Sequence, residues 1–119
     1  MNKDKRIAVA LLADLCGAYS TQRTLPNKVL IILRDAVKDL ADSEARSVKK
    51  MEPFKDNAGT AANYQNGLAC WEDLARAQDA LEEGEVDEAH PLLARVASGV
   101  VSPPEKLSPK LKRRIKKVK

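Results

Sequence analysis

Residues 60–98 read TAANYQNGLACWEDLARAQDALEEGEVDEAHPLLARVAS, and this stretch decides the fold class. In its first part the bulky and apolar residues recur every three or four positions up to Glu83, which is the period of an amphipathic helix. Gly84 then ends the predicted helix, because glycine adopts the left-handed conformation at a helix end at little cost. The residues that keep the helical spacing are Tyr64, Leu68, Trp71, Leu74, Ala75, Gln78 and Leu81.

A second helix is predicted directly after the glycine. Asp87 is a candidate cap, and Pro91 comes early enough in the helix to be tolerated. Gly99 is expected to close this helix. Its predicted buried face consists of Leu92, Leu93, Val96 and Ala97. The two helices therefore form a hairpin with a short turn.

The turn of this hairpin resembles the turn between the two helices of a tetratricopeptide repeat. The resemblance rests on residues 80–89 followed by Leu92 and Leu93. It covers about 30 residues. A solenoid of such repeats needs at least about three copies, and no second copy appears in this sequence near a spacing of 34 residues. The Trp-Leu-Gly-Tyr part of the motif is absent as well. We therefore interpret the segment as a generic helical hairpin and transfer no function to it.

Two further helices are predicted before the hairpin. The first, from Asp4 to about Tyr19, has an apolar stripe at i, i+3, i+4, i+7, i+8 and i+11. Its members are Ala8, Leu11, Leu12, Leu15, Cys16 and Tyr19.

The next helix starts at Pro26, which suits a first turn, and ends before Pro53. Its stripe comprises Leu30, Leu33, Val37, Leu40, Ala41, Ala45, Val48 and Met51. Because residues 42–50 are thinly apolar, we expect this end to project beyond the core or to contact another subunit.

The composition fits one all-α domain. A chain of 119 residues, 44% hydrophobic and only 3% aromatic, has room for one core built from aliphatic side chains around few large anchors. We expect an antiparallel bundle of about four helices over residues 1–101. The predicted large anchors are Tyr19, Phe54, Tyr64 and Trp71. The residues predicted to share one core are Leu33, Val37, Leu68, Trp71, Leu74, Leu92 and Val96.

Residues 102–119 form a separate basic tail in this prediction. It opens with Ser102-Pro103-Pro104, which breaks the preceding helix, and Glu105 is its one acid against eight Lys and Arg residues. Ser108 and Pro109 are a predicted cap and first-turn residue of a short amphipathic helix, whose apolar side would hold Leu111, Ile115 and Val118. The candidate binding residues are the cations Lys106, Lys110, Lys112, Arg113, Arg114, Lys116, Lys117 and Lys119.

Charge is strongly segregated along the chain. The overall net charge is +4, yet residues 102–119 carry +7, and residues 72–88 hold eight acids against Arg76 alone. Clustered cations of this kind bind the phosphates of nucleic acids without sequence preference. They also suit an acidic protein surface, either residues 72–88 of this chain or those of a partner. A solvated tail that only aids solubility is the third alternative. Membrane binding is disfavoured, because the apolar side is short and contains no aromatic anchor.

The sequence offers little for catalysis. His90 stands before Pro91 without a nucleophile nearby in the sequence, so we interpret it as a structural residue. Glu85 and Glu88 are spaced to share a divalent metal on one helix face, as in all-α nucleotide pyrophosphatases, but such a site needs a facing acidic pair. The best candidate pair is Asp35 with Asp39. Phosphate-binding loops, zinc-ligand spacings and nucleophile motifs are absent from the sequence. We therefore predict no enzyme, no metal and no cofactor.

Cysteine content and hydropathy indicate the compartment. Cys16 and Cys70 both stand among apolar residues, as expected for buried free thiols in a reducing environment. The basic start could resemble a signal peptide, but Asp14 interrupts the apolar run and no cleavage site follows. No stretch has the length of a membrane span. We predict a cytoplasmic protein.

Taken together, these features predict a non-enzymatic helical interaction or regulatory protein that binds another macromolecule. A protein partner or acidic surface is the expected ligand, and self-association into a homo-oligomer stays open. The alternative is a small nucleic-acid-binding protein that contacts phosphates through the basic tail.

Overall fold

The computed structural model describes residues 1–22, 26–99 and 107–118, and every regular element in these ranges is helical. The all-α prediction is therefore confirmed. The predicted boundary between the body and the tail lies outside the described residues. The elements are α1 (Lys3–Gln22), α2 (Asn27–Met51), the short 3₁₀ helix η1 (Glu52–Phe54), α3 (Ala58–Glu82), α4 (Val86–Ser98) and α5 (Pro109–Lys117).

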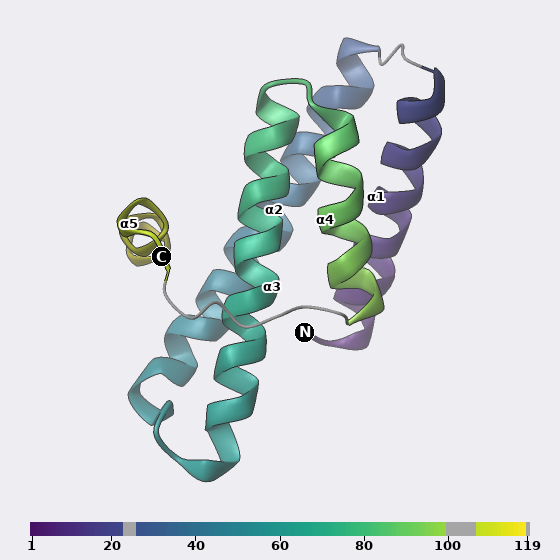
Figure 1. Ribbon diagram of the computed structural model, residues 1–119. Helices are drawn as coiled ribbons and strands as arrows, with labels where there is room; N and C mark the ends of the chain where they lie inside the picture. Colours follow the sequence, from purple (N-terminus) through teal and green to yellow (C-terminus); the bar gives the residue numbers. More distant parts are fainter. Residues whose placement is uncertain (23–25, 100–106, 119) are drawn as a thin grey trace.

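The first four helices lie alongside one another, and consecutive helices run in opposite directions (Figure 1). α1 packs mainly on α4, α4 on α3, and α3 on α2, whereas α1 and α2 touch little. The order in space is therefore α1, α4, α3, α2, and α1 lies at an edge. α2 and α3 are the longest helices, with 25 residues each, and their joined ends extend beyond α1 and α4 (Figure 1).

The turn between α3 and α4 forms as the sequence predicts. Gly84 has a positive φ of 77°, and its N–H donates to Leu81 at 3.1 Å. The N–H of Glu85 donates to the carbonyl oxygen of Ala80 at 2.8 Å, so the last carbonyls of α3 are satisfied. Gly99 has the same positive φ at the end of α4.

Three helix starts differ slightly from the predictions. α3 begins at Ala58, because the carbonyl oxygen of Asn57 accepts hydrogen bonds from Thr60 and Ala61, which places Thr60 inside the first turn. α4 begins at Val86, so Asp87 also lies inside the first turn, where an acid interacts favourably with the helix dipole. Pro26 precedes α2 rather than occupying its first turn.

The core contains most of the residues predicted for it. Leu33, Val37, Trp71, Leu74 and Val96 belong to one buried cluster, with Trp71 only 1% exposed. Leu92 is half-buried against this cluster, and Leu68 is buried outside it. These residues come from α2, α3 and α4, so the three helices share one core.

The prediction of Phe54 as a core anchor is wrong, since its side chain is 56% exposed. It lies in η1, at the far end of the α2–α3 hairpin, where neither α1 nor α4 reaches (Figure 1). Tyr19 and Tyr64 are half-buried, so Trp71 is the one fully buried aromatic residue among those described.

The prediction for α1 is right for part of the stripe only. Cys16 is buried and Leu12 packs against the core, as predicted, but the other buried residues are Val9 and Ala13, whereas Leu11 and Leu15 of the predicted stripe are 60% and 44% exposed. α1 carries two apolar stripes, and the one with smaller side chains faces α4. At Gly17 the two helices meet so closely that an added Cβ would lie 3.0 Å from Nε2 of His90. Small residues permit this close approach, and large leucines would not fit there.

The end of α2 extends together with α3 beyond α1 and α4, which is the first of the two predicted alternatives (Figure 1), and yet part of it is buried. Ala45 and Val48 are fully buried against α3. α3 presents Gly67 at this contact, where an added Cβ would lie 3.0 Å from Cγ2 of Val48. The absence of a side chain on Gly67 lets the two helices approach, so a thinly apolar segment is still buried.

Candidate interaction surfaces

Five of the predicted tail cations lie exposed on α5. They are Lys110, Lys112, Arg113, Lys116 and Lys117. Lys106 and Lys119 lie outside the described residues. Arg114 differs from the others, because its Nη1 donates to Oδ1 of Asp79 at 2.7 Å and its side chain is only 26% exposed. Arg114 therefore contacts the protein's own body rather than facing solvent.

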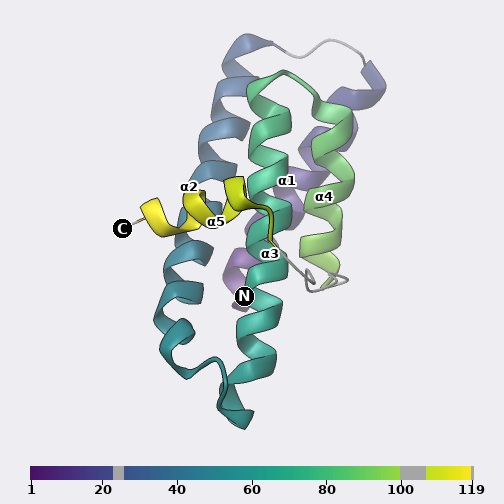
Figure 2. The same cartoon turned by 60° about the vertical axis from the view of Figure 1, so that its left-hand side comes forward.

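The apolar side of α5 faces the other helices. Leu111 is buried in the core cluster, and Ile115 and Val118 pack half-buried against it. The helix lies across α2 and α3 (Figure 2). Ser108 caps its start by accepting a hydrogen bond from the N–H of Leu111 at 3.3 Å. One face of α5 is thus docked, and the opposite face carries the cations.

Lys49 of α2 holds the other end of α5. Its Nζ donates to the carbonyl oxygen of Lys116 at 3.2 Å and also to that of Val118. A cation at the carboxyl end of a helix satisfies free carbonyl groups and interacts favourably with the helix dipole. In α5 this contact involves backbone carbonyl groups. The side chains of the exposed cations on that helix take no part in it.

Asp79 of the predicted acidic cluster pairs with Arg114 of α5. Two other members pair within the body: Arg76 binds Glu72 and Arg95 binds Asp73, both at 2.7 Å. Asp73 is buried, and burial raises the pKa of its carboxyl group while Arg95 lowers it. The ion pair of Asp73 and Arg95 joins α3 to α4, so Asp73 stabilises the body, while Asp79 contributes to the docking of α5 on this chain's own acidic segment, one of the predicted alternatives.

The outer face of α1 is apolar and uncovered by the described residues. Ile7, Leu11 and Leu15 stand at i, i+4 and i+8, and they are 50%, 60% and 44% exposed. This spacing places the three side chains in one row along the helix. Contiguous exposed apolar surface is uncommon on monomers, so this row is a candidate contact surface. Sequence analysis missed it, because it assigned Leu11 and Leu15 to the core.

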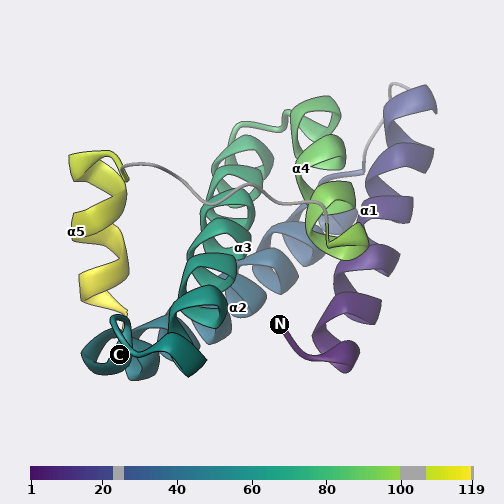
Figure 3. The ribbon, with the colours of Figure 1, turned by 60° about the horizontal axis from the view of Figure 1, so that its bottom comes forward.

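Two further large apolar side chains are exposed near the start of α2. Ile31 and Ile32 are 46% and 65% exposed. They belong to the first turns of α2, which begins at the end of the molecule where α1 finishes (Figure 1). α1 and α5 lie at opposite edges of the molecule (Figure 3). The apolar row and the basic helix are therefore two separate surfaces.

The residues considered above for metal binding and catalysis lie on α2, on α4 and directly before α4. Within residues 1–22, 26–99 and 107–118, no three His, Cys, Asp or Glu side chains are grouped closely enough to hold a metal ion. Asp35, Asp39, Glu85 and Glu88 are all exposed. His90 packs against Gly17, as a structural residue does.

The two cysteines are free and buried, as predicted. Burial raises the pKa of the Cys16 thiol to about 11. It also raises the pKa of the Cys70 thiol, with a smaller contribution from the Glu44 carboxylate. Both thiols therefore stay protonated at neutral pH, which keeps them weakly nucleophilic.

Comparison with known proteins found no matching family model, no matching curated protein and no matching solved structure. The resemblance to a tetratricopeptide repeat is thus limited to the turn between α3 and α4. None of the described helices is both long enough and apolar enough to span a membrane.

Proposed function

We propose that this protein is a non-enzymatic interaction protein whose docking surface is the apolar row on α1. The observation that supports it is the exposure of Ile7, Leu11 and Leu15 on one face of an edge helix. An amphipathic helix with an open apolar face is a common binding element for a partner helix or groove. The antiparallel arrangement of α1–α4 acts as the scaffold, and the predicted cytoplasmic location belongs to the same proposal.

The size of the apolar row limits the free energy of binding that it can supply. Burying a fully exposed aliphatic side chain contributes about 1.5–3 kcal/mol, and these three are already about half buried. Association itself costs at least about 4 kcal/mol. Three half-buried residues barely offset this cost, so a stable complex also needs Ile31 and Ile32 or polar contacts around the row.

Site-specific photo-crosslinking tests this proposal. A photoreactive residue at position 11 should give a discrete crosslinked product in the native host, and Ile7→Ser with Leu15→Ser should reduce its yield about tenfold. The matched control is the same residue at position 54, because Phe54 is equally exposed but lies at the far end of the molecule. A product of twice the chain mass identifies a second copy, and any other mass identifies a different partner. If position 11 gives no product, or only the product seen at position 54, the proposal is wrong.

A second candidate function is nucleic-acid binding through α5. It is favoured by the docking of α5, which turns Leu111 inward and leaves five cations exposed on one short, ordered helix. Such a helix neutralises phosphates at a smaller ordering cost than a free tail. Because α5 contains no aromatic residue on which bases can stack, binding should show no sequence preference.

Salt dependence of binding to a labelled DNA duplex checks this candidate. With five phosphates neutralised, the slope of log affinity against log salt should approach about −4.5. Replacing Lys110, Lys112, Arg113, Lys116 and Lys117 by glutamine should remove the binding. Leu111→Ser with Ile115→Ser is the control, because it undocks the helix but keeps every cation. Unchanged affinity after the five replacements would exclude α5 as the contact.

A further inference from the structure

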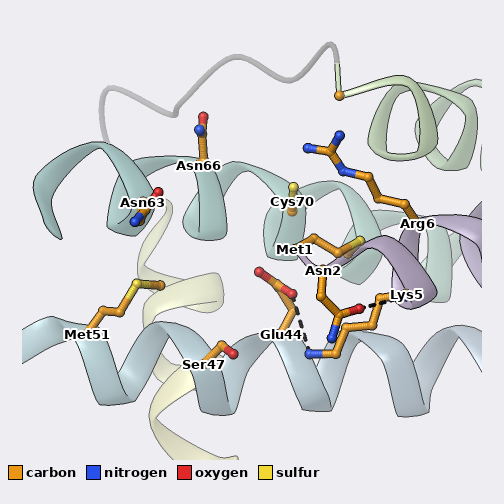
Figure 4. A pocket seen from close by; sticks show the side chains of 11 residues that line it. Met1, Asn2, Lys5, Arg6, Glu44, Ser47, Met51, Asn63, Asn66 and Cys70 are labelled. Atoms are coloured by element: carbon orange, nitrogen blue, oxygen red, sulfur yellow. Dashed lines mark hydrogen bonds and ion pairs between the residues drawn. The ribbon is translucent and has the colours of Figure 1, made fainter. Parts of the chain in front are cut away.

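A polar cavity of about 430 Å³ lies where the longer α2–α3 hairpin leaves the other two helices (Figure 4). It is bounded by the start of α1, the second half of α2 and the first half of α3, and Gly99 lies at one edge. Its volume falls within the range of small-molecule sites, about 300–1,000 Å³. The cavity exists because α1 begins at Lys3 and α4 ends at Ser98, so neither helix fills the space beside the hairpin.

The most unusual side chain in this cavity is Glu44. It is only 2% exposed, and no donor in the described part of the chain lies within hydrogen-bond distance of its Oε2. Lys5 forms an ion pair with Glu44, its Nζ lying 3.9 Å from Oε2, which is too far for a hydrogen bond. A buried carboxylate oxygen that accepts no hydrogen bond is costly. A ligand that donates to this oxygen would remove that cost.

The other charged side chains of the cavity come from α1. Lys5 is 23% exposed, and Arg6 is exposed beside Gly99, with its Nη1 3.5 Å from the Cβ position of that glycine. The charged side chains lining the cavity thus comprise two cations and one buried carboxylate. A ligand with both charge types would therefore find a partner for each: Glu44 for an ammonium group, and Lys5 and Arg6 for a carboxylate.

The opposite wall contributes neutral hydrogen-bonding groups. Asn63 and Asn66 stand one helical turn apart on α3, and Ser47 of α2 also lines the cavity (Figure 4). Met51 supplies an apolar surface at the same place. These groups suit the polar and aliphatic parts of a small molecule.

We propose that this cavity binds a small zwitterion of the amino-acid class. Its ammonium group donates to Glu44 and fills the vacant hydrogen-bonding capacity of Oε2. Its carboxylate faces Lys5 and Arg6, which lie on the α1 side of the cavity. A zwitterion offers an oppositely charged group to both charge types of the cavity. This site is independent of the apolar row on α1 and of the basic face of α5.

Binding of the common L-amino acids to the full chain tests the proposal by calorimetry. At least one should bind with a Kd of about 1 mM or tighter. Its N-acetyl derivative lacks the ammonium group, and its decarboxylated amine lacks the carboxylate, so each should bind at least about tenfold more weakly. Each chemical half of the ligand is thereby tested separately.

Two variants test the assignment of the site. Glu44→Gln keeps the shape but removes the charge, and it should weaken binding about tenfold or more. Ser47→Leu fills the cavity without changing any charge and should do the same. Glu72→Gln is the matched control, because Glu72 pairs with Arg76 elsewhere on α3, and it should bind as the wild type does. Fluorescence of Trp71, the sole tryptophan, shows that each variant is folded.

Three results would overturn the proposal. They are no binding by any amino acid, equal binding by the amine or the N-acetyl derivative, and unchanged affinity in Glu44→Gln. Should Glu44→Gln fail to fold, the Ser47→Leu variant and the two ligand analogues still decide the matter.

Discussion

Replacing Trp71 by alanine is expected to lower the free energy of unfolding by about 3–5 kcal/mol, the usual cost of removing a buried aromatic side chain. Trp71 is 1% exposed and is the largest side chain in the core cluster, so its loss leaves a large cavity in the core. Small domains are stable by only about 5–15 kcal/mol, so the variant should melt far below the wild type or fail to fold. Thermal unfolding followed by circular dichroism measures the effect.

Phe54→Ala is the control for this experiment. Phe54 is also a large aromatic residue, but it is 56% exposed at the end of the α2–α3 hairpin. Surface substitutions usually change stability by no more than about 0.5 kcal/mol, so its melting temperature should stay near that of the wild type. Equal effects of the two substitutions would contradict the core described above.

Replacing both Leu111 and Ile115 by serine is expected to undock α5 from the body. A nine-residue helix is marginal in isolation, so its stability depends on the packing of its apolar side. The ion pair of Arg114 with Asp79 is partly exposed, and such pairs contribute at most about 1 kcal/mol. It cannot hold the helix alone. Amide hydrogen exchange of residues 110–118 should therefore be slow in the wild type and become fast in the double variant.

Lys112→Ser with Lys116→Ser is the matched control. These residues have the same i, i+4 spacing on the exposed side of α5. Their replacement changes two side chains to serine without touching the docked face, so protection of residues 110–118 should persist. Fast exchange of this segment in the wild-type protein would show that α5 is not docked in solution.

Local signals in the sequence predicted the helices well, for physical reasons that act over short distances. Gly84 ends α3 because a left-handed residue is needed there, and Ser108 caps α5 because its hydroxyl accepts a backbone hydrogen bond. The segregation of charge also depends on sequence alone. The helix starts were less accurate, since Asn57 and Glu85 precede the helices in place of the predicted caps.

The candidate sites were predicted less completely. The sequence identified the cations of α5, but it did not show that Arg114 contacts Asp79 and so differs from its neighbours. It did not indicate the cavity at all, because Lys5, Glu44 and Asn66 come from three different helices. The apolar row on α1 was missed because Leu11 and Leu15 follow a helical period as well as any core residue does.

By itself the sequence determined the all-α class, the ends of the α3–α4 hairpin and the separation of acidic from basic segments, since these depend on neighbouring residues. The tertiary structure decided which stripe of α1 is buried, because only the contact of Gly17 with α4 selects the smaller side chains for the interface. It also decided the burial of Glu44 at the end of α2, where Gly67 lets two helices approach closely. Both outcomes depend on the fit between helices distant in sequence, and periodicity within one helix carries no information about that fit.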